Sequence, residues 1–284
     1  MAELNLNDIY RQQLSDAEFK KLSSFIYNEC GIKLPPIKRV MLQCRLQKRL
    51  RHLQLGTFKD YIDYLFNSNG GNTEIIHMLD VVSTNKTDFF RESSHFDYMQ
   101  ETVLPEFAKK NQMGTLKVWS AGCSSGEEPY TLVMVLYEFA EKNSGFNFSI
   151  WATDISTRIL ETAMNGVYKE EKVAVVPLSL KKKYMLKSKD RINPTVKMAP
   201  HVRSKVNFAR LNLMDEKYSV PETFDVIFCR NVLIYFDRDT QESVINKLCN
   251  KLKPGGYLFL GHSESILNMN VPLKQVNPTI YIRL

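Results

Sequence analysis

The sequence lacks several features that would mark a secreted, metal-bound or membrane-embedded protein. Its five cysteines are scattered and form no Cys-x-x-Cys pair, so neither a disulfide framework nor a metal site is expected. No apolar run approaches the roughly 20 residues of a membrane helix, and residues 1–10 carry no apolar signal-peptide core. These absences predict a cytoplasmic protein that does not insert directly into a membrane.

Acidic residues are fewer than basic ones. The chain has 31 Asp and Glu against 38 Lys and Arg, which gives a net charge of +7. This charge indicates an acidic partner, either nucleic acid or an acidic protein surface, and does not choose between them. With 284 residues, 44% of them hydrophobic, the chain is long enough for two globular domains or one large one.

The most informative segment joins a buried strand to a helix through a turn of small residues, Val118-Trp-Ser-Ala-Gly-Cys-Ser-Ser-Gly-Glu-Glu-Pro-Tyr130. Gly122 and Gly126 let the backbone approach a ligand closely at a helix N-terminus. A phosphate-binding P-loop would need a lysine here, but Glu127 and Glu128 stand instead. Carboxylates repel phosphate and suit a ligand with a cationic amine or a sugar diol, such as S-adenosylmethionine.

The chain changes character near residue 116. Before it, the patterns are helical, with helices expected at 16–30, 36–53 and 58–66. After it, strands and helices alternate, which predicts an α/β fold with a mostly parallel, doubly wound sheet and a last antiparallel strand at 279–284. Strands are expected at 116–120, 150–153, 206–209, 225–229 and 257–261, and helices at 129–142, 156–164 and 239–252.

One long stretch interrupts the alternation. About 40 residues separate Gly166 from Val206, more than a usual connection, and they end in a basic, turn-rich run. This stretch is either a small inserted β-hairpin or a tolerated surface excursion. We expect a helical domain at 1–83, a linker at 84–98 that contributes to the ligand site, and an α/β domain at 99–284 with a β-insertion at about 187–207.

Polar residues follow three of the expected strands, where open α/β sheets bind ligands. Asp154 ends the second strand and could bridge a ribose diol, or cap the helix that follows. Asn212 could bind the edge of a purine with Leu213 against its face, although such a loop is more often only a turn. Arg230 and Asn231 end the fourth strand.

Two further groups have a structural and a functional interpretation. Tyr235 is either a core tyrosine or part of the site beside the fourth strand. Asn85, Thr87 and Arg91 lie with two phenylalanines between the helical and α/β regions. They are either a helix cap and a solvated arginine, or a linker that folds over the ligand.

The second expected helix is strongly basic. Lys38, Arg45 and Arg49 share one stripe, because their spacings of seven and four residues return to the same face. A charge run is usually a solvated surface, but a cluster without an interleaved acid favours docking of an acidic partner. We expect this stripe to bind that partner.

Taken together, these motifs resemble the chemotaxis receptor glutamate O-methyltransferases, the CheR family. The resemblance covers nearly the whole chain and rests on four segments in order. They are Asn85-Lys-Thr-Asp-Phe-Phe-Arg91, Trp119-Ser-Ala-Gly-Cys-Ser-Ser-Gly-Glu-Glu-Pro-Tyr130, Phe228-Cys-Arg-Asn-Val-Leu-Ile-Tyr-Phe236 and Gly261-His-Ser-Glu264.

The resemblance implies an all-α domain, a class I S-adenosylmethionine-dependent methyltransferase domain and an inserted three-stranded β-subdomain that in some members binds a receptor tail. It implies methylation of glutamates on the cytoplasmic part of chemotaxis receptors, with Arg91 and Tyr235 as catalytic candidates. The residues implied around the cofactor are Asn85, Thr87, Arg91, Gly122, Glu127, Glu128, Asp154, Asn212, Leu213, Arg230 and Asn231.

Two rival classes share the fold. A nucleic-acid methyltransferase would fit the charge, but the fourth-strand loop Arg230-Asn-Val-Leu233 lacks the proline pair common in amino-group methylation of bases, and no Pro-Cys nucleophile is present. A non-catalytic S-adenosyl-ligand-binding module is disfavoured by the intact glycine turn, Asp154 and Tyr235. We therefore expect no nucleic-acid partner.

Overall fold

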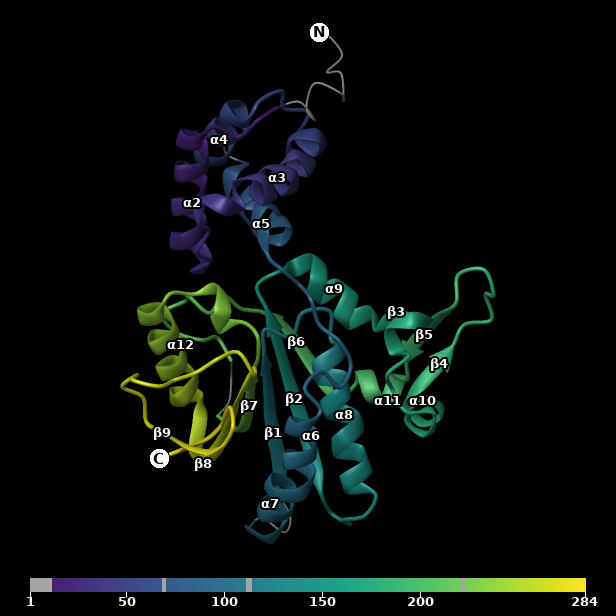
Figure 1. Ribbon diagram of the computed structural model, residues 1–284. Helices are drawn as coiled ribbons and strands as arrows, with labels where there is room; N and C mark the ends of the chain where they lie inside the picture. The colour runs from purple at the N-terminus through teal and green to yellow at the C-terminus, as the bar shows by residue number, and fades with distance from the viewer. Residues whose placement is uncertain (1–11, 68–69, 111–113, 221–222) are drawn as a thin grey trace. The chain divides into compact units, whose positions relative to one another are not determined.

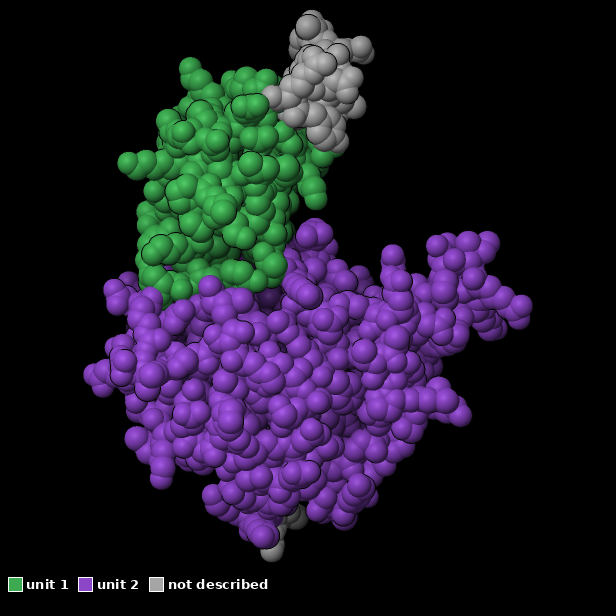
Figure 2. All heavy atoms as spheres, viewed as in Figure 1, with its two compact units in different colours: residues 1–84, 235–237 green, residues 85–234, 238–284 purple. Residues whose placement is uncertain are grey.

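The computed structural model describes residues 12–67, 70–110, 114–220 and 223–284. It divides the chain into two compact units, shown in green and purple in Figure 2. The helical unit contains residues up to 84 together with the short segment Tyr235–Asp237, and the α/β unit contains residues 85–234 and 238–284. In the described part of the chain, no helix combines the length and the apolar character needed to span a bilayer.

The helical unit is built from short amphipathic helices. They are α2 (Asp16–Cys30), the 3-10 turn η1 (Pro36–Lys38), α3 (Arg39–Leu53), α4 (Phe58–Asn67) and α5 (Gly71–Val82). Helix α2 begins with a capping box, in which Ser15 accepts from the Glu18 amide and Glu18 accepts from the Ser15 amide. Ser15 is thus the N-cap residue, and α2 ends at the left-handed Gly31.

A buried ion pair links two helices of this unit. Arg49 on α3 donates from Nε and Nη2 to the two carboxylate oxygens of Glu74 on α5, at 2.9 and 2.7 Å. The Glu74 side chain is 2% exposed, and Tyr61 donates a third hydrogen bond to it. Arg45 donates to the carbonyls of Val82 and Ser83 at the end of α5.

These contacts correct the expected docking stripe on the second helix. Arg45 and Arg49 are bound inside the helical unit, and only Lys38 of the three expected residues is exposed. Arg49 is not free for a partner because it pairs with Glu74. The spacing of residues along α3 could not reveal this pair, since Glu74 lies on another helix.

The α/β unit is organised around a seven-stranded sheet (Figure 1). Its strand order is β6-β2-β1-β7-β8-β10-β9, with β10 antiparallel to both neighbours and the strands from β6 to β8 parallel. The strands are β1 (Thr115–Ala121), β2 (Asn147–Asp154), β6 (Val206–Arg210), β7 (Phe224–Cys229), β8 (Leu252–Leu260), β9 (Leu273–Asn277) and β10 (Ile280–Arg283). This arrangement confirms the expected mostly parallel sheet with a last antiparallel strand.

Helices cover the sheet because its strands are apolar on both faces. Helix α8 packs on β2 and β6, and α12 packs on β8. Inside the sheet, Phe228 of β7 stacks on Phe259 of β8 with ring centroids 4.3 Å apart. The helical elements of this unit are α6 (Ser94–Tyr98), the π-helical turn η2 (Met99–Val103), α7 (Leu104–Lys110), α8 (Glu127–Ala140), α9 (Thr157–Asn165), η3 (Glu170–Val173), α10 (Leu178–Tyr184), α11 (Pro200–Arg203) and α12 (Arg238–Lys251). The 3-10 turn η4 (Leu233–Tyr235) begins in this unit, and its last residue is grouped with the helical unit.

The stretch between α9 and β6 forms a separate antiparallel sheet of order β3-β5-β4. Its strands are β3 (Val167–Lys169), β4 (Met185–Lys187) and β5 (Thr195–Met198). The sheet therefore begins at Val167, well before the expected start near residue 187. Gly166 explains the early start, because its left-handed conformation (φ 60°) ends α9 and turns the chain directly into β3.

We predict that Arg49→Met destabilises the helical unit by about 3–5 kcal/mol, because Glu74 would remain buried without its partner. Urea unfolding followed by circular dichroism measures the change. Lys48→Met, on the exposed side of the same helix, is the control and should change the free energy of unfolding by less than about 0.5 kcal/mol. Equal unfolding curves for Arg49→Met and wild type would contradict the structural role of the pair.

Candidate functional site

The glycine turn lies at the carboxyl ends of β1 and β2. The amides of Gly122 and Cys123 both donate to the carbonyl of Thr153, at 2.8 and 2.9 Å. Gly122 has φ 88°, and a Cβ there would lie 2.4 Å from Val232. Gly126, at φ 94°, starts α8. At these two positions of the turn, any side chain larger than that of glycine would meet its neighbours. Such a turn allows a nucleoside to approach the backbone closely.

Asp154 binds this cradle from the end of β2. Its Oδ2 accepts from the amide of Ser124 at 2.8 Å, and its Oδ1 accepts from the amide of Ser156 at 3.0 Å. Ser156, not Asp154, is the N-cap residue of α9 and accepts from the Ile159 amide. Asp154 thus aligns both turns, and a carboxylate has further lone pairs with which it could accept sugar hydroxyls.

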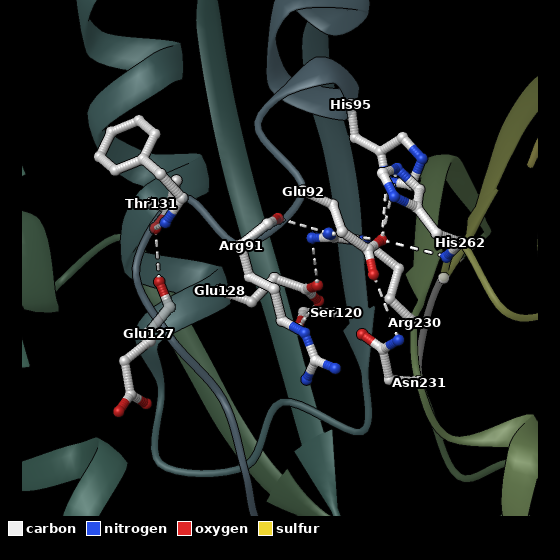
Figure 3. Close-up of polar contacts among 12 residues, drawn as sticks. Arg91, Glu92, His95, Ser120, Glu127, Glu128, Thr131, Arg230, Asn231 and His262 are labelled. Atoms are coloured by element: carbon white, nitrogen blue, oxygen red, sulfur yellow. Dashed lines mark hydrogen bonds and ion pairs between the residues drawn. The ribbon is translucent and has the colours of Figure 1, made fainter. Parts of the chain in front are cut away.

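Glu127 and Glu128 have different surroundings, although they are adjacent. Glu128 accepts from Ser120 Oγ at 2.7 Å and from Arg230 Nη1 at 3.1 Å. Glu127 accepts from Ser125 Oγ at 2.6 Å, and Lys172 Nζ lies 3.8 Å from it. In Figure 3 the two carboxylates point apart, with only Glu128 directed at Arg230. Burial raises the pKa of both carboxyls, against the opposing effect of the neighbouring cations and hydrogen bonds.

Arg230 is the centre of a buried polar network (Figure 3). Its side chain is 3% exposed. Nη1 donates to Glu128, while Nη2 donates to Glu92 at 3.0 Å and to the backbone carbonyl of Arg91. The expected ligand residue Arg230 therefore holds the segment that carries Arg91 beside the start of α8.

Glu92 is a residue that the sequence motifs did not single out. Besides Arg230, it accepts from Asn231 Nδ2 at 3.3 Å and from the His262 amide at 3.2 Å. Burial acts to raise the pKa of Glu92, but its hydrogen bond and ion pair with Arg230 outweigh burial and lower it. Glu92 is itself left-handed (φ 55°), so Arg91 lies in a strained turn that these bonds stabilise.

His95 and His262 lie next to Glu92, and the three side chains are of the kinds that can bind a metal ion. Burial, followed by the charge of Arg230, lowers the pKa of His95 to about 4, so its imidazole is neutral at pH 7. His95 Nε2 lies 2.9 Å from Thr279 Oγ1, and the ring packs edge-on against His262. Because a guanidinium lies 3.0 Å from the Glu92 carboxylate, a cation would be repelled there. We interpret the group as part of the polar network.

Glu264 organises the loop after β7. Its buried carboxylate accepts from the amides of Asn231, Leu233 and Gly261 at 2.9, 2.7 and 2.6 Å. Asn231 is left-handed (φ 59°), and a Cβ on Gly261 would lie 2.8 Å from its amide nitrogen. The sequence contained this signal as Gly261-His-Ser-Glu264, but spacing alone gave it no role.

The other expected residues of the α/β unit are placed as follows. The carbonyl of Asn85 accepts from Ser124 Oγ at 3.1 Å, so the 85–91 segment lies on the glycine turn. Thr87 is buried, and half-buried Arg91 donates from Nη1 to Lys86 O at 2.9 Å. After β6, Asn212 Oδ1 accepts from the Met214 amide, and Leu213 is buried.

Tyr235 belongs to the helical unit, where its carbonyl accepts from the Lys33 amide at 3.0 Å. Asp237 of the same short segment is bound there too, since its carboxylate accepts from the Tyr27 hydroxyl. The structure thus brings the expected cofactor residues together at the carboxyl ends of the strands and groups Tyr235 with the helices.

The sheet order, the glycine cradle and the acid after β2 define a class I S-adenosylmethionine-dependent methyltransferase. The model of the S-adenosylmethionine-binding domain of CheR methyltransferases matches residues 85–282, and the model of their all-alpha domain matches residues 17–83. The chain belongs to the CheR family of methyltransferases, as the motifs predicted.

Curated relatives agree with this assignment over almost the full length. The chemotaxis protein methyltransferase of Borreliella burgdorferi is 39% identical, covering 98% of this chain and 96% of its own. The enzyme of the same name from Escherichia coli is 37% identical, covering 95% and 92%. A solved magnesium protoporphyrin IX methyltransferase from Synechocystis is 13% identical, with 80% of this chain and 97% of its own chain covered and a TM-score of 0.35.

We predict that Asp154→Ala weakens S-adenosylmethionine binding by about 1.5–3 kcal/mol, the range for a hydrogen bond to a charged group. Isothermal titration calorimetry on the folded variant measures the change. Asp97→Ala removes an exposed carboxylate from α6 and should leave affinity unchanged. If Asp154→Ala binds as tightly as wild type, Asp154 has only the turn-aligning role.

Proposed function

We propose that this chain transfers the methyl group of S-adenosylmethionine to glutamate side chains of chemotaxis receptors and forms methyl esters. The proposal adds one point to family membership, namely that the atom that accepts the methyl group is a glutamate carboxylate oxygen. The names of the relatives support a chemotaxis substrate. Five free thiols suit a reducing compartment, and we place the reaction in the cytoplasm.

The observation that carries the proposal is how the acidic groups of the site are used. Glu92, Glu128 and Glu264 each accept hydrogen bonds from Arg230 or from backbone amides, so they serve as structural acceptors. A glutamate acceptor needs no base to remove a proton, because its reference pKa of about 4.3 leaves it ionised at pH 7. A site whose carboxylates are engaged in this way suits an acceptor that is already an anion.

The residues of the chain would then act by orientation and charge. S-adenosylmethionine supplies an electrophilic methyl group on a cationic sulfur, and transfer to a carboxylate oxygen leaves a neutral thioether. Gly122 and Gly126 give the backbone cradle, while Glu127 and Asp154 are the carboxylates that we assign to the amine and the ribose. Asn212 and Leu213 would contact the base.

Arg91 is the residue that we propose for binding the acceptor. Among the described residues, its side-chain hydrogen bond goes to a single carbonyl, that of Lys86, so other guanidinium donors can meet a carboxylate. Orientation of this kind can contribute on the order of 7–11 kcal/mol at best. The neutral ester product would lose its attraction to Arg91, which favours release. Tyr235 is the second residue that we propose for orienting the acceptor.

Methyl transfer from tritiated S-adenosylmethionine tests the chemistry. We expect label on receptor protein and none on RNA, with volatile methanol released by mild base as the mark of a carboxyl ester. Arg91→Ala should lower kcat about 100-fold, on the scale of removing one transition-state hydrogen-bond donor, and Tyr235→Phe should also lower it. Lys142→Ala, which removes an exposed charge beyond α8, is the control. Label on RNA, or base-stable label on protein, would refute the proposed acceptor.

We further propose that the receptor docks on exposed basic residues of the helical unit. Lys38 and Lys48 remain exposed on η1 and α3, whereas Arg45 and Arg49 do not serve this surface. Exposed pairs are individually weak, about 0–1 kcal/mol, so several charges would act together and mainly on association. A receptor tail on the β3-β5-β4 sheet, which the family resemblance implies, would be a second contact.

The double variant Lys38→Glu/Lys48→Glu should raise KM for receptor several-fold at low salt, and the difference should shrink at high salt because surface charges are screened. Affinity for S-adenosylmethionine should not change. Lys59→Glu, which reverses an exposed charge on α4, is the control. It shows whether a change in KM comes from the position of the charges or only from the net charge of the protein. Wild-type kinetics for the double variant at low salt would reject docking through these residues.

A further inference from the structure

The inserted β3-β5-β4 sheet sends two side chains towards the cofactor site. Tyr168 lies on β3, and Lys172 lies on η3, the 3-10 turn that follows β3. Both residues contact segments that we propose for cofactor binding, the glycine turn and the 85–91 segment.

Lys172 contacts the 85–91 segment and the start of α8 at once. Its ammonium donates to the carbonyl of Thr87 and, at 2.7 Å, to the carboxylate of Asp88. The same nitrogen lies 3.8 Å from Oε1 of Glu127, whose side chain is 1% exposed. One cation therefore lies between two carboxylates that come from different parts of the cofactor site.

Tyr168 contacts the glycine turn itself. Its hydroxyl donates to the carbonyl of Ser125 at 2.7 Å, and the residue is 5% exposed. The ring packs edge-on against Phe89, with centroids 5.0 Å apart. A Cβ on Gly126 would lie 3.0 Å from the Tyr168 hydroxyl, so the turn and the tyrosine fit closely.

The inserted sheet fixes the position of both residues. The amide of Glu170, at the start of η3, donates to the carbonyl of Pro194 between β4 and β5. The Glu170 carboxylate also pairs with Lys187 of β4 at 2.5 Å. The turn that carries Lys172 is therefore tied to both other strands of the small sheet.

From these contacts we infer that Tyr168 and Lys172 are positioning residues for the cofactor site, and that the inserted sheet is a structural part of that site as well as a separate surface. The inference rests on the proposed cofactor role of Glu127 and the 85–91 segment. Lys172 sets the distance between the 85–91 segment and Glu127. Tyr168 holds the glycine turn, which leads directly into Glu127.

Charge gives this role a signature that simple loss of packing would not produce. Burial raises the pKa of Glu127, and Lys172 opposes that rise. The other titratable groups acting with Glu127 are Asp88, Tyr168 and Cys123. Without the ammonium, the Glu127 pKa should rise further, because Asp88 would then act on it uncompensated. If S-adenosylmethionine binding needs ionised Glu127, affinity should fall as the pH is lowered, and in a variant without the ammonium this fall should begin at a higher pH than in the wild type.

The test compares Lys172→Met, Lys172→Arg and Tyr168→Phe with wild type, using calorimetric affinity for S-adenosylmethionine from pH 5 to 9 and receptor methylation kinetics. Lys172→Met should bind S-adenosylmethionine about tenfold more weakly at pH 7, a change of about 1.4 kcal/mol, and its acid limb should move to higher pH. Lys172→Arg should recover most of the affinity. Tyr168→Phe should weaken binding without moving the acid limb. KM for receptor should stay within twofold.

Lys169→Met is the matched control. Its ammonium is on the same β3–η3 segment but is 79% exposed and pairs only with Glu171 among the described residues. An unchanged affinity and acid limb in Lys172→Met, with wild type binding and methylating normally, would overturn the inference and leave the proposed function intact. Failure of the wild type to methylate receptor carboxylates would instead reject the proposed function. Equal losses in Lys169→Met and Lys172→Met would also overturn the positioning role.

Discussion

The arrangement of the site depends on one buried cation, the guanidinium of Arg230. It pairs with Glu128 on α8 and with Glu92 beside Arg91, and it also binds the Arg91 carbonyl. Burying a charge costs free energy unless charged or hydrogen-bonding partners compensate it. Loss of one of these three contacts would therefore leave part of the buried guanidinium uncompensated and weaken the whole arrangement. The end of β7, the start of α8 and the turn that carries Arg91 are consequently set by a single residue.

The same logic explains why strained backbone collects here. Phe90, Glu92, Ser124 and Asn231 are non-glycine residues with positive φ, and each lies in a segment of the site. Such conformations cost about 1–3 kcal/mol each and persist only when the surroundings determine them. Ser124 is held by Asp154, Asn231 by Glu264 and Glu92 by Arg230, while the Phe90 amide donates to Thr131. Three of the four strained residues are therefore supported by the charged side chains that shape the site.

Much of the fold could be predicted from the sequence because it depends on local patterns. The glycine turn, the apolar strands and the antiparallel last strand follow from spacing and composition, and the motifs indicated the family. The errors about single side chains concern partners that are distant in sequence. Arg49 looked like a surface charge because Glu74, its partner 25 residues away, lies on a different helix. Glu92 carried no signal, because its importance comes from Arg230 and His262, which only the folded sheet brings near it.

The grouping of Tyr235–Asp237 with the helices has a consequence for how the chain can be divided. The Lys33 amide and the Tyr27 hydroxyl bind this short segment, although it is encoded between β7 and α12 of the α/β unit. The helical unit is therefore discontinuous in sequence. A single cut after residue 84 would remove the donors of those two bonds from the chain that carries their acceptors. The 235–237 segment belongs to the helical unit although the α/β unit flanks it in sequence, so a chain cut after residue 84 encodes neither unit as a complete module.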